Sequence, residues 1–393
     1  MLRVLELFAG IGACSKALER LGIEHEIVDA VEVDKYAIKS FNAIHGTSFE
    51  PQDIRDWDKD IQVDLVMHGS PCQDFSVAGK GAGGDEGSGT RSSFMYETLR
   101  IVEKLKPEIV IWENVKNLLS KKHRHNFDAY LDAMSDLGYT NYYQVLNAKD
   151  YGVPQNRERV FTVSIMGDEQ DGYSFPEPIK IEKRLKDVLE DSVDDKFYIK
   201  DASSLTIGTS FDVINGGKIG RMHDISRRAY HEDSIAPAMH TCQGGNQEPK
   251  ISVSVDVSKT VRASGRGSMD RHTWDVVAVP IKTANKKGYD MATDGDGIDL
   301  AYPESKTRRG RVEHGVAKTI PTNDSQGTLD GFRIRKLTPR ECWRLMGFDD
   351  ADFDKAQAAG VSNTQLYKQA GNSIVVDCLE GILNNLLIEK EEE

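Results

Sequence analysis

The stretch Val4-Leu5-Glu6-Leu7-Phe8-Ala9-Gly10-Ile11-Gly12 decides the fold class that we predict for this chain. Its first four residues form a short candidate strand, and two glycines follow within a turn. A segment with helical spacing comes next, marked by Ala17, Leu18 and Leu21 and closed by Gly22. A strand that turns through glycines into a helix is typical of the opening unit of an α/β domain.

Strands and helices alternate outward from this stretch over the first third of the chain. We predict further strands at 27–33, 63–67 and 109–112, and helices around 36–41, 94–105 and 127–137. Short apolar strands joined by helices predict a parallel sheet that is covered on both faces. Ligands of such sheets bind beyond the carboxyl ends of the strands, so we expect the functional site at that edge.

Length and composition exclude several protein classes. A chain of 393 residues predicts two to three domains. No apolar run reaches the ~18 residues that a membrane span needs, and the N-terminus lacks an apolar signal region, so we expect neither membrane insertion nor secretion. Five scattered cysteines form neither a disulfide framework nor a Cys-x-x-Cys metal pair. This cysteine usage indicates a reducing compartment, and we expect a cytoplasmic protein.

Charge is unevenly distributed along the chain. The formal net charge is −13, but residues 216–336 contain 20 Lys and Arg against 15 Asp and Glu, or +5, which leaves −18 on the remainder. A cationic segment on an acidic chain suits a phosphate-binding module attached to a catalytic body. Ordinary variation of surface charge is the open alternative.

The pattern changes beyond residue 167 to short β-prone pieces rich in Gly, Ser, Thr and Arg. Three related pieces at 235–241, 258–264 and 317–323 each predict a small strand that leads into a polar loop, with chance similarity as the alternative. Helical character returns at Pro339. We therefore predict a catalytic and cofactor-binding domain at 1–180, a β-rich target recognition domain at 181–335, and a hinge and C-terminal return at 336–393 that completes the first domain.

Several residues at the predicted strand ends suit a nucleoside cofactor. Glycines at 10 and 12 let a ligand approach the backbone where a helix begins, although a simple tight turn would have the same glycines. Glu32 ends the second strand, where an acid can accept both hydroxyls of a ribose. The Asp53 carboxylate could accept a hydrogen bond from an adenine amino group. No basic residue in these segments is placed to bind a pyrophosphate, and this favours S-adenosylmethionine over NAD as the cofactor.

A thiol, a carboxylic acid and two guanidinium groups are expected at the same edge. Cys72 follows the third strand and is placed for nucleophilic attack, although a lone cysteine in a loop is more often structural. Glu113 ends the fourth strand. Arg157 and Arg159 occupy alternate positions near a further strand, so we expect them on one face.

Six sequence blocks in order resemble those of the C5-cytosine-specific DNA methyltransferases of bacteria and phages. The blocks are 8–12, 69–76 (Gly-Ser-Pro-Cys-Gln-Asp-Phe-Ser), 113–115 (Glu-Asn-Val), 155–159 (Gln-Asn-Arg-Glu-Arg), 335–348 and 369–375 (Gln-Ala-Gly-Asn-Ser-Ile-Val). They frame nearly the whole chain. The resemblance implies an S-adenosylmethionine-dependent, Rossmann-like α/β fold, with a variable central region that reads DNA sequence.

The resemblance also implies a mechanism without a metal. Cys72 would add to C6 of a cytosine flipped out of the duplex, while Glu113 holds N3 and the exocyclic amine and supplies a proton to N3. Asn114 would orient the pocket, and Arg159, with Arg157 behind it, would hold O2. The expected cofactor residues are Phe8, Gly10, Ile11, Gly12, Glu32, Val33, Asp53, Ile54, Pro71, Asn372 and Ser373.

DNA contacts and a mobile lid are predicted from glycine and arginine patterns. Segment 79–89 contains six glycines and is expected to close over the flipped base, with a disordered surface loop as the alternative. The arginines are candidates for phosphate or guanine contacts, but a solvated charge run would look the same. The expected DNA-binding residues are Gln73, Ser76, Arg262, Arg266, Arg308, Arg309, Arg311 and Thr319.

We therefore predict a monomeric DNA (cytosine-5-)-methyltransferase of a prokaryotic cytoplasm. It would act on double-stranded DNA, and a restriction endonuclease that reads the same site is a candidate partner. Two alternatives stay open, an RNA (tRNA) cytosine methyltransferase that shares these blocks and a catalytically inactive DNA-binding regulator. The intact set of Cys72, Glu113 and Arg159 argues against the regulator.

Overall fold

The computed structural model describes most of the first half of the chain and its C-terminal part. The described residues are 1–71, 94–167, 172–197, 206–208, 228–231, 235–239, 249–254, 279–282, 289–292, 297–299, 312–313, 326–328 and 332–388. The chain divides into two compact units. Unit 1 comprises Met1–Lys183, Pro237–Gln243 and Pro339–Glu393, and unit 2 comprises Arg184–Ala236 and Gly244–Thr338. The placement of 237–243 in unit 1 was not foreseen from the sequence.

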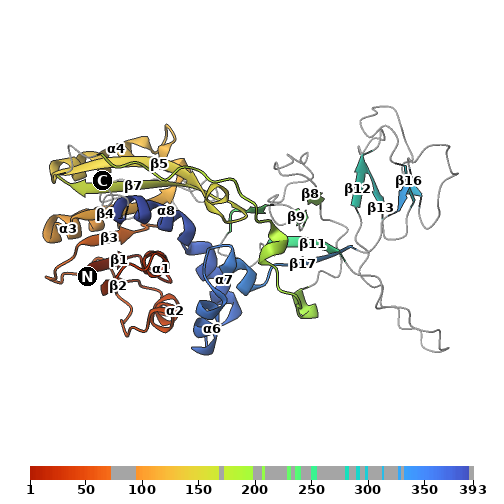
Figure 1. Cartoon of the computed structure of the whole chain (residues 1–393), viewed down its shortest axis with the longest axis horizontal. Coiled ribbons are helices and arrows are strands. Elements are labelled where there is room, and N and C mark those ends of the chain that lie inside the picture. The colour runs from red at the N-terminus through yellow and green to blue at the C-terminus, as the bar shows by residue number, and fades with distance from the viewer. Residues whose placement is uncertain are drawn as a thin grey trace. The chain divides into compact units, whose positions relative to one another are not determined.

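A six-stranded sheet is the centre of unit 1 (Figure 1). Its strand order is β2-β1-β3-β4-β7-β5. The bounds are β1 Leu2–Leu7, β2 His25–Val31, β3 Leu65–His68, β4 Ile109–Val115, β5 Tyr139–Asn147 and β7 Glu158–Met166. The first four strands are parallel, as predicted, whereas β7 runs antiparallel to both β4 and β5. The sequence did not predict β5, in which only Tyr139 and Leu146 are buried.

Helices cover both faces of this sheet, and alternation along β1 shows how. Leu5 and Leu7 face the apolar cluster that contains Trp112, Phe127 and Tyr130. The intervening Glu6 accepts hydrogen bonds from Ser15 on the other face. The helices involved are α1 Ala13–Arg20, α2 Lys35–His45, α3 Met95–Leu105, α4 Arg124–Asp136 and α8 Val376–Leu387. Because side chains alternate along a strand, α4 and α1 pack on opposite faces.

The C-terminal part returns to the N-terminal half of the sheet. It contains α5 Pro339–Arg344, α6 Asp350–Ala358 and α7 Asn363–Asn372, followed by α8. In Figure 1 these blue helices lie beside the red and orange α1 and α2, and α8 contacts α1 while α6 and α7 contact α2. The division into units assigns Pro339–Glu393 to unit 1.

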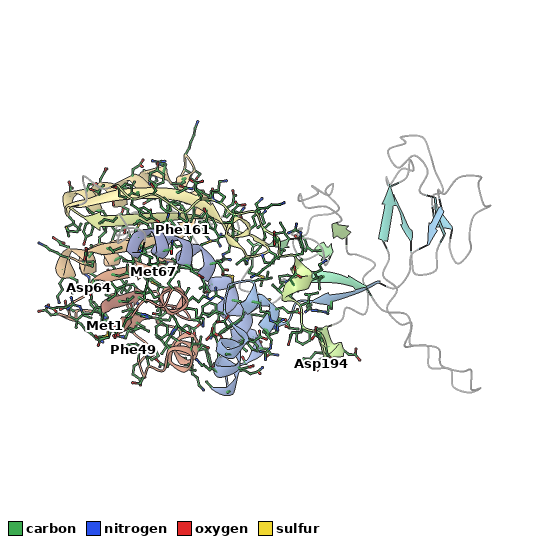
Figure 2. The ribbon with its side chains drawn as sticks, in the orientation of Figure 1. Met1, Phe49, Asp64, Met67, Phe161 and Asp194 are labelled. Carbon is green, nitrogen blue, oxygen red and sulfur yellow. The ribbon has the colours of Figure 1, made fainter. Side chains whose placement is uncertain are left out.

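Buried side chains fill the interior of unit 1 (Figure 2). Met67 of β3 and Phe161 of β7 are among them, with 2% and 1% of their surfaces exposed. Cys14, Cys342 and Cys378 are buried as well and act as small apolar residues. Short elements join the main ones: β6 Gln155–Asn156, β10 Ala236–Pro237, η2 Lys116–Leu119 and η3 Ala148–Tyr151. Within the described ranges, no helix combines the length and apolar character needed to cross a membrane.

Unit 2 is rich in strands where it is described, as predicted. A four-stranded sheet has the order β17-β11-β9-β8, a pair joins β12 and β13, and three further strands have the order β15-β14-β16. The bounds are β8 Thr206–Gly208, β9 Arg228–His231, β11 Lys250–Ser254, β12 Val279–Lys282, β13 Tyr289–Ala292, β14 Gly297–Asp299, β15 Val312–Glu313, β16 Gln326–Thr328 and β17 Phe332–Lys336, with the short helices η4 Leu185–Val188 and η5 Asp195–Phe197.

Candidate active site

Four parallel strands end at one edge of the sheet, and several of the described residues that the sequence predicts for the site follow or end these strands. The loop 8–12 follows β1, Glu32 and Val33 follow β2, and Gly69-Ser70-Pro71 follows β3. Glu113 and Asn114 are the last residues of β4 before its final residue, Val115. This is the carboxyl edge at which ligands of open α/β sheets bind.

The loop after β1 has a conformation that needs its glycines and leaves room at one of them. Gly10 has a φ of +57°, and a Cβ placed on it would meet no atom within 4 Å. Its N–H donates to Glu32 Oε2 at 3.2 Å, while Asp34 N–H donates to Glu32 Oε1 at 2.8 Å. Burial raises the pKa of Glu32. The loop and the end of β2 are therefore joined through one carboxyl group beside open space.

We expected the missing side chain of Gly12 to leave room for a ligand, but the structure shows no such space there. Its φ is +82°, and a Cβ there would overlap the imidazole of His45 and lie 2.9 Å from Phe41. Protein side chains, rather than ligand space, occupy this position. The glycine is still required, but for a reason that the sequence did not reveal.

The other expected cofactor residues differ in accessibility. Val33 is 70% exposed, so an apolar surface is available next to Glu32. Ile54 is buried, and its carbonyl accepts from Arg100 Nη2 at 2.9 Å. Asp53 accepts hydrogen bonds from Arg55, which lowers the pKa of Asp53. An adenine amino group at Asp53 would have to share the carboxylate with that guanidinium.

Asn372 and Ser373 are brought to this region by α7, which is tied to α2. Gln369 Nε2 donates to the Tyr36 carbonyl at 2.8 Å, and Lys368 forms an ion pair with Asp34 at 2.6 Å. Asp34 is also the N-cap of α2. The end of α7 and the segment after β2 are therefore anchored together, although more than 300 residues separate them in the chain.

Glu113 and Arg159 form an ion pair across β4 and β7. Arg159 Nε lies 2.9 Å from Glu113 Oε1, and 19% and 11% of the two side chains are exposed. Arg159 pairs with Val115 in the antiparallel register, so Glu113 lies diagonally opposite on the same face. The structure thus brings together the acid and one of the two predicted guanidinium groups.

Arg157 does not share the environment of Arg159. It lies between β6 and β7 rather than within one strand, so the expectation of two arginines on alternate positions of one strand face is wrong. The Arg157 side chain is buried and donates to the carbonyls of Met239 (3.0 Å), Gly371 (3.2 Å) and Ser373 (2.8 Å). It holds backbone from two further segments of unit 1, and one of them, at 371–373, is expected to contact the cofactor.

A buried hydrogen-bond chain that the sequence did not reveal supports the start of the loop with Cys72. Trp112 Nε1 donates to Ser70 Oγ at 3.0 Å, and Asn114 Nδ2 donates to the Ser70 carbonyl at 3.3 Å. Trp112 also stacks on His68, whose Nε2 lies 3.0 Å from Tyr130 Oη. Only the position of Ser70 directly before Pro71-Cys72 could have drawn attention to it.

Several predicted residues lie outside the described residues. They are Cys72, Gln73, Ser76, the glycine-rich segment 79–89, Arg262, Arg266, Arg308, Arg309, Arg311 and Thr319. The roles assigned to them from the sequence stay predictions. Pro71 is the last described residue before this gap, and it is partly buried.

Comparison with known proteins shows the family. The sequence model of the C-5 cytosine-specific DNA methylases matches residues 2–387. The chain is 33% identical over 477 residues to the orphan methyltransferase M.SPBetaI of Bacillus phage SPbeta, covering 100% of this chain and 99% of that protein. It is 28% identical to the type II methyltransferase M.HhaI of Haemophilus parahaemolyticus, covering 98% and 94%.

Solved structures agree at the level of the fold. The crystal structure of the S. pombe Dnmt2 methyltransferase superposes with a TM-score of 0.61 and 18% identity and covers all of both chains. A putative DNA modification methyltransferase encoded within an E. coli prophage has a TM-score of 0.58 at 18% identity. The strand-end loops, the acid–guanidinium pair and these matches lead to one conclusion: the chain belongs to the C-5 cytosine-specific DNA methylase family.

Proposed function

We propose that this enzyme transfers a methyl group from S-adenosylmethionine to C5 of a flipped-out cytosine in a specific short double-stranded DNA sequence. The family supports cytosine-C5 methylation of DNA. The observation that carries the residue assignment is the Glu113–Arg159 pair, because it puts an acid and a cation at the carboxyl edge where β3 leads toward Cys72.

The residues beside the first two strands fit a nucleoside with a sulfonium group. Gly10 leaves open space, the Glu32 carboxyl group lies at the strand end to accept from ribose hydroxyls, and Val33 offers an exposed apolar surface to a base. When bound, S-adenosylmethionine supplies the methyl group on an electrophilic carbon. Asn372 and Ser373 are assigned to the same site through the anchoring of α7.

We assign the chemistry on the pyrimidine ring to Cys72, Glu113 and Arg159. The Cys72 thiolate forms a bond to C6 while Glu113 donates a proton to N3, so that electron density moves to C5. C5 then takes the methyl group from the sulfonium, leaving S-adenosylhomocysteine. Loss of the C5 proton breaks the bond between C6 and sulfur and releases the Cys72 thiolate, and N3 returns its proton to Glu113. Arg159 is assigned to O2 of the base, where its charge offsets the negative charge that builds on the ring.

Asn114 and Arg157 are assigned positioning roles. Asn114 ties β4 to the Ser70 carbonyl, two residues before Cys72 in the chain. Arg157 holds the carbonyls of Gly371 and Ser373. Neither role requires direct contact with the base, which revises the sequence-based expectation that Arg157 stands directly behind Arg159.

Unit 2 is assigned the reading of DNA. Its β-rich described part and the cationic segment 216–336 support this role, and the arginines at 262, 266, 308, 309 and 311 are the residues proposed for phosphate or base contacts. We further propose that the chain acts as a monomer in a prokaryotic cytoplasm. A restriction endonuclease that reads the same site stays a prediction from the sequence.

Bisulfite sequencing of DNA from cells that express the chain tests the proposal. Protected cytosines within one short sequence are expected for the wild type and none for Cys72→Ser. The purified enzyme should also form a stable covalent complex with duplex DNA that contains 5-fluorocytosine, since that base has no C5 proton to lose. Transfer of labelled methyl to tRNA and not to DNA would overturn the proposed substrate, and methylation by Cys72→Ser would overturn the nucleophile.

A further inference from the structure

His45 is the last residue of α2, yet its imidazole contacts the loop that follows β1. His45 Nε2 lies 3.2 Å from the carbonyl oxygen of Ile11. A carbonyl can only accept, so Nε2 carries the hydrogen and donates it. Burial lowers the pKa of His45 to about 4, so the ring is neutral at physiological pH. The ring packs against Phe41, with centroids 4.7 Å apart.

The hydrogen bond gives the Ile11 carbonyl a donor between two carbonyls of the turn that accept from backbone N–H groups. The Ala9 carbonyl accepts from Gly12 N–H at 3.0 Å, and the Gly12 carbonyl accepts from Lys16 N–H at 3.0 Å. The Ile11 carbonyl, between them, receives His45 Nε2. Because an unsatisfied buried carbonyl is costly, removal of the imidazole donor would favour a different conformation of the turn.

The missing side chain of Gly12 is matched to this ring. A Cβ at Gly12 would overlap His45, so residue 12 must be glycine for the imidazole to reach Ile11. The same turn carries Gly10, whose N–H is bonded to Glu32. The other end of α2 begins at Asp34, whose N–H is also bonded to Glu32. Helix α2 therefore contacts the proposed nucleoside site at both of its ends.

We propose that His45 is a positioning residue for the cofactor: its Nε2–H holds the Ile11 carbonyl and thereby keeps the 8–12 turn in the shape that binds the nucleoside. This inference rests on the proposed function, because it takes the 8–12 turn as part of an S-adenosylmethionine site. His45 itself is not assigned a contact with the ligand, and none of the six family-like blocks contains it.

Calorimetric titration of the full chain with S-adenosylhomocysteine tests the donor. His45→Phe keeps a ring but removes the N–H, and we expect the dissociation constant to rise about tenfold. His45→Gln keeps an N–H donor and should stay within about threefold of the wild type. His25→Ala is the matched control, because His25 Nδ1 makes the same kind of contact with the Ile23 carbonyl, at 2.8 Å and at the start of β2. Its affinity should be unchanged.

Steady-state kinetics separates positioning from general stability. His45→Phe should raise KM for S-adenosylmethionine while kcat at saturation stays within about threefold, because a misplaced turn weakens binding rather than the pyrimidine chemistry. A purely structural loss would instead lower kcat and the melting temperature and leave the affinity of the folded fraction unchanged. That pattern, or wild-type affinity in His45→Phe, would overturn the inference.

A double-variant cycle keeps the test decisive even if His45→Phe does not fold. Gly12→Ala is strained by its φ and overlaps the His45 ring, whereas Gly12→Ala in a His45→Ala background keeps the strain and the approach to Phe41 but loses the overlap with the imidazole. The factor by which the double variant loses affinity should therefore be smaller than the product of the factors measured for Gly12→Ala and His45→Ala alone. Multiplicative losses would contradict the packing of His45 against Gly12.

The same titration distinguishes failure of this inference from failure of the proposed function. Equal affinity of the wild-type chain and of His45→Phe for S-adenosylhomocysteine overturns the inference alone. A wild-type chain that does not bind it overturns the cofactor assignment, and the inference with it. Binding that depends on His45 supports the inference whether or not DNA proves to be the methyl acceptor.

Discussion

Arg159 Nε lies 2.9 Å from Glu113 Oε1, and the two residues belong to antiparallel neighbours, β7 and β4. The ion pair lies where the parallel part of the sheet ends and the strand direction reverses. A parallel β7 would need its own crossover, and its carboxyl end rather than its amino end would then lie beside Glu113. The reversal brings Arg159, the second residue of β7, next to an acid at the end of β4.

Loss of Arg159 should impair chemistry more than folding. In Arg159→Ala we expect kcat to fall by about 100-fold, the usual order for removal of a donor that stabilises developing charge. Lys116→Met is the control, because Lys116, which directly follows β4, pairs with Glu158 at the start of β7 while 54% and 46% of these side chains are exposed. It should keep kcat within about twofold, since exposed pairs contribute little. Wild-type kcat in Arg159→Ala, measured by methyl transfer to DNA, would contradict the assignment to O2.

Arg157 should be needed for stability. Arg157→Met leaves three backbone carbonyls without their donor, and we expect the free energy of unfolding to fall by about 3 kcal/mol. Arg124→Met removes an exposed arginine that pairs with Asp128 and should cost under about 1 kcal/mol. Urea denaturation followed by circular dichroism measures both. An Arg157 variant of wild-type stability but without activity would point to direct substrate contact instead.

Ser70 and Trp112 should behave as a coupled pair. Ser70→Ala leaves the buried indole N–H of Trp112 without its acceptor, which costs about 1–3 kcal/mol. Trp112→Phe removes that donor, so Ser70→Ala should cost at least about 1 kcal/mol less in the Trp112→Phe background. The four midpoints of urea denaturation test this coupling, and additive losses would show that the hydrogen bond contributes no stability.

Glu6 should make stability depend on pH. Burial raises the pKa of Glu6 to about 7, against an ordinary value of 4.5. Between these values the folded chain retains a proton that the unfolded chain has released, so the free energy of unfolding falls as pH rises through this window. Glu6→Gln does not titrate and can still accept from Ser15. Relative to the wild type, the variant should therefore gain about 3 kcal/mol between pH 4.5 and pH 8.

Urea titrations of both proteins across that pH range measure the difference directly. Titration of the other carboxyl groups cancels when the variant is compared with the wild type at each pH. Parallel stability curves for the two proteins would show that Glu6 has the same pKa in the folded and unfolded chains.

Local sequence determined the parallel part of the sheet, β1 to β4, and the edge at which the candidate site residues were sought. Short runs rich in apolar residues identify β1 to β4, and glycines follow β1 and β3, because short buried strands and strand–helix turns are encoded within a few neighbouring residues. Since parallel strands end at one edge, the same information brings Glu32, Ser70 and Glu113 to that edge. The ordered blocks were enough to indicate the family.

Only the tertiary structure decided which of these side chains meet and what each glycine is for. Arg157 and Arg159 are two residues apart, yet one holds backbone carbonyls and the other an acid, because the strand begins between them. Gly12 accommodates His45, which is 33 residues away, and such a contact depends on how α2 packs against the turn. Hydrogen bonds and packing between distant segments carry no local sequence period, so they become visible only once the chain is folded.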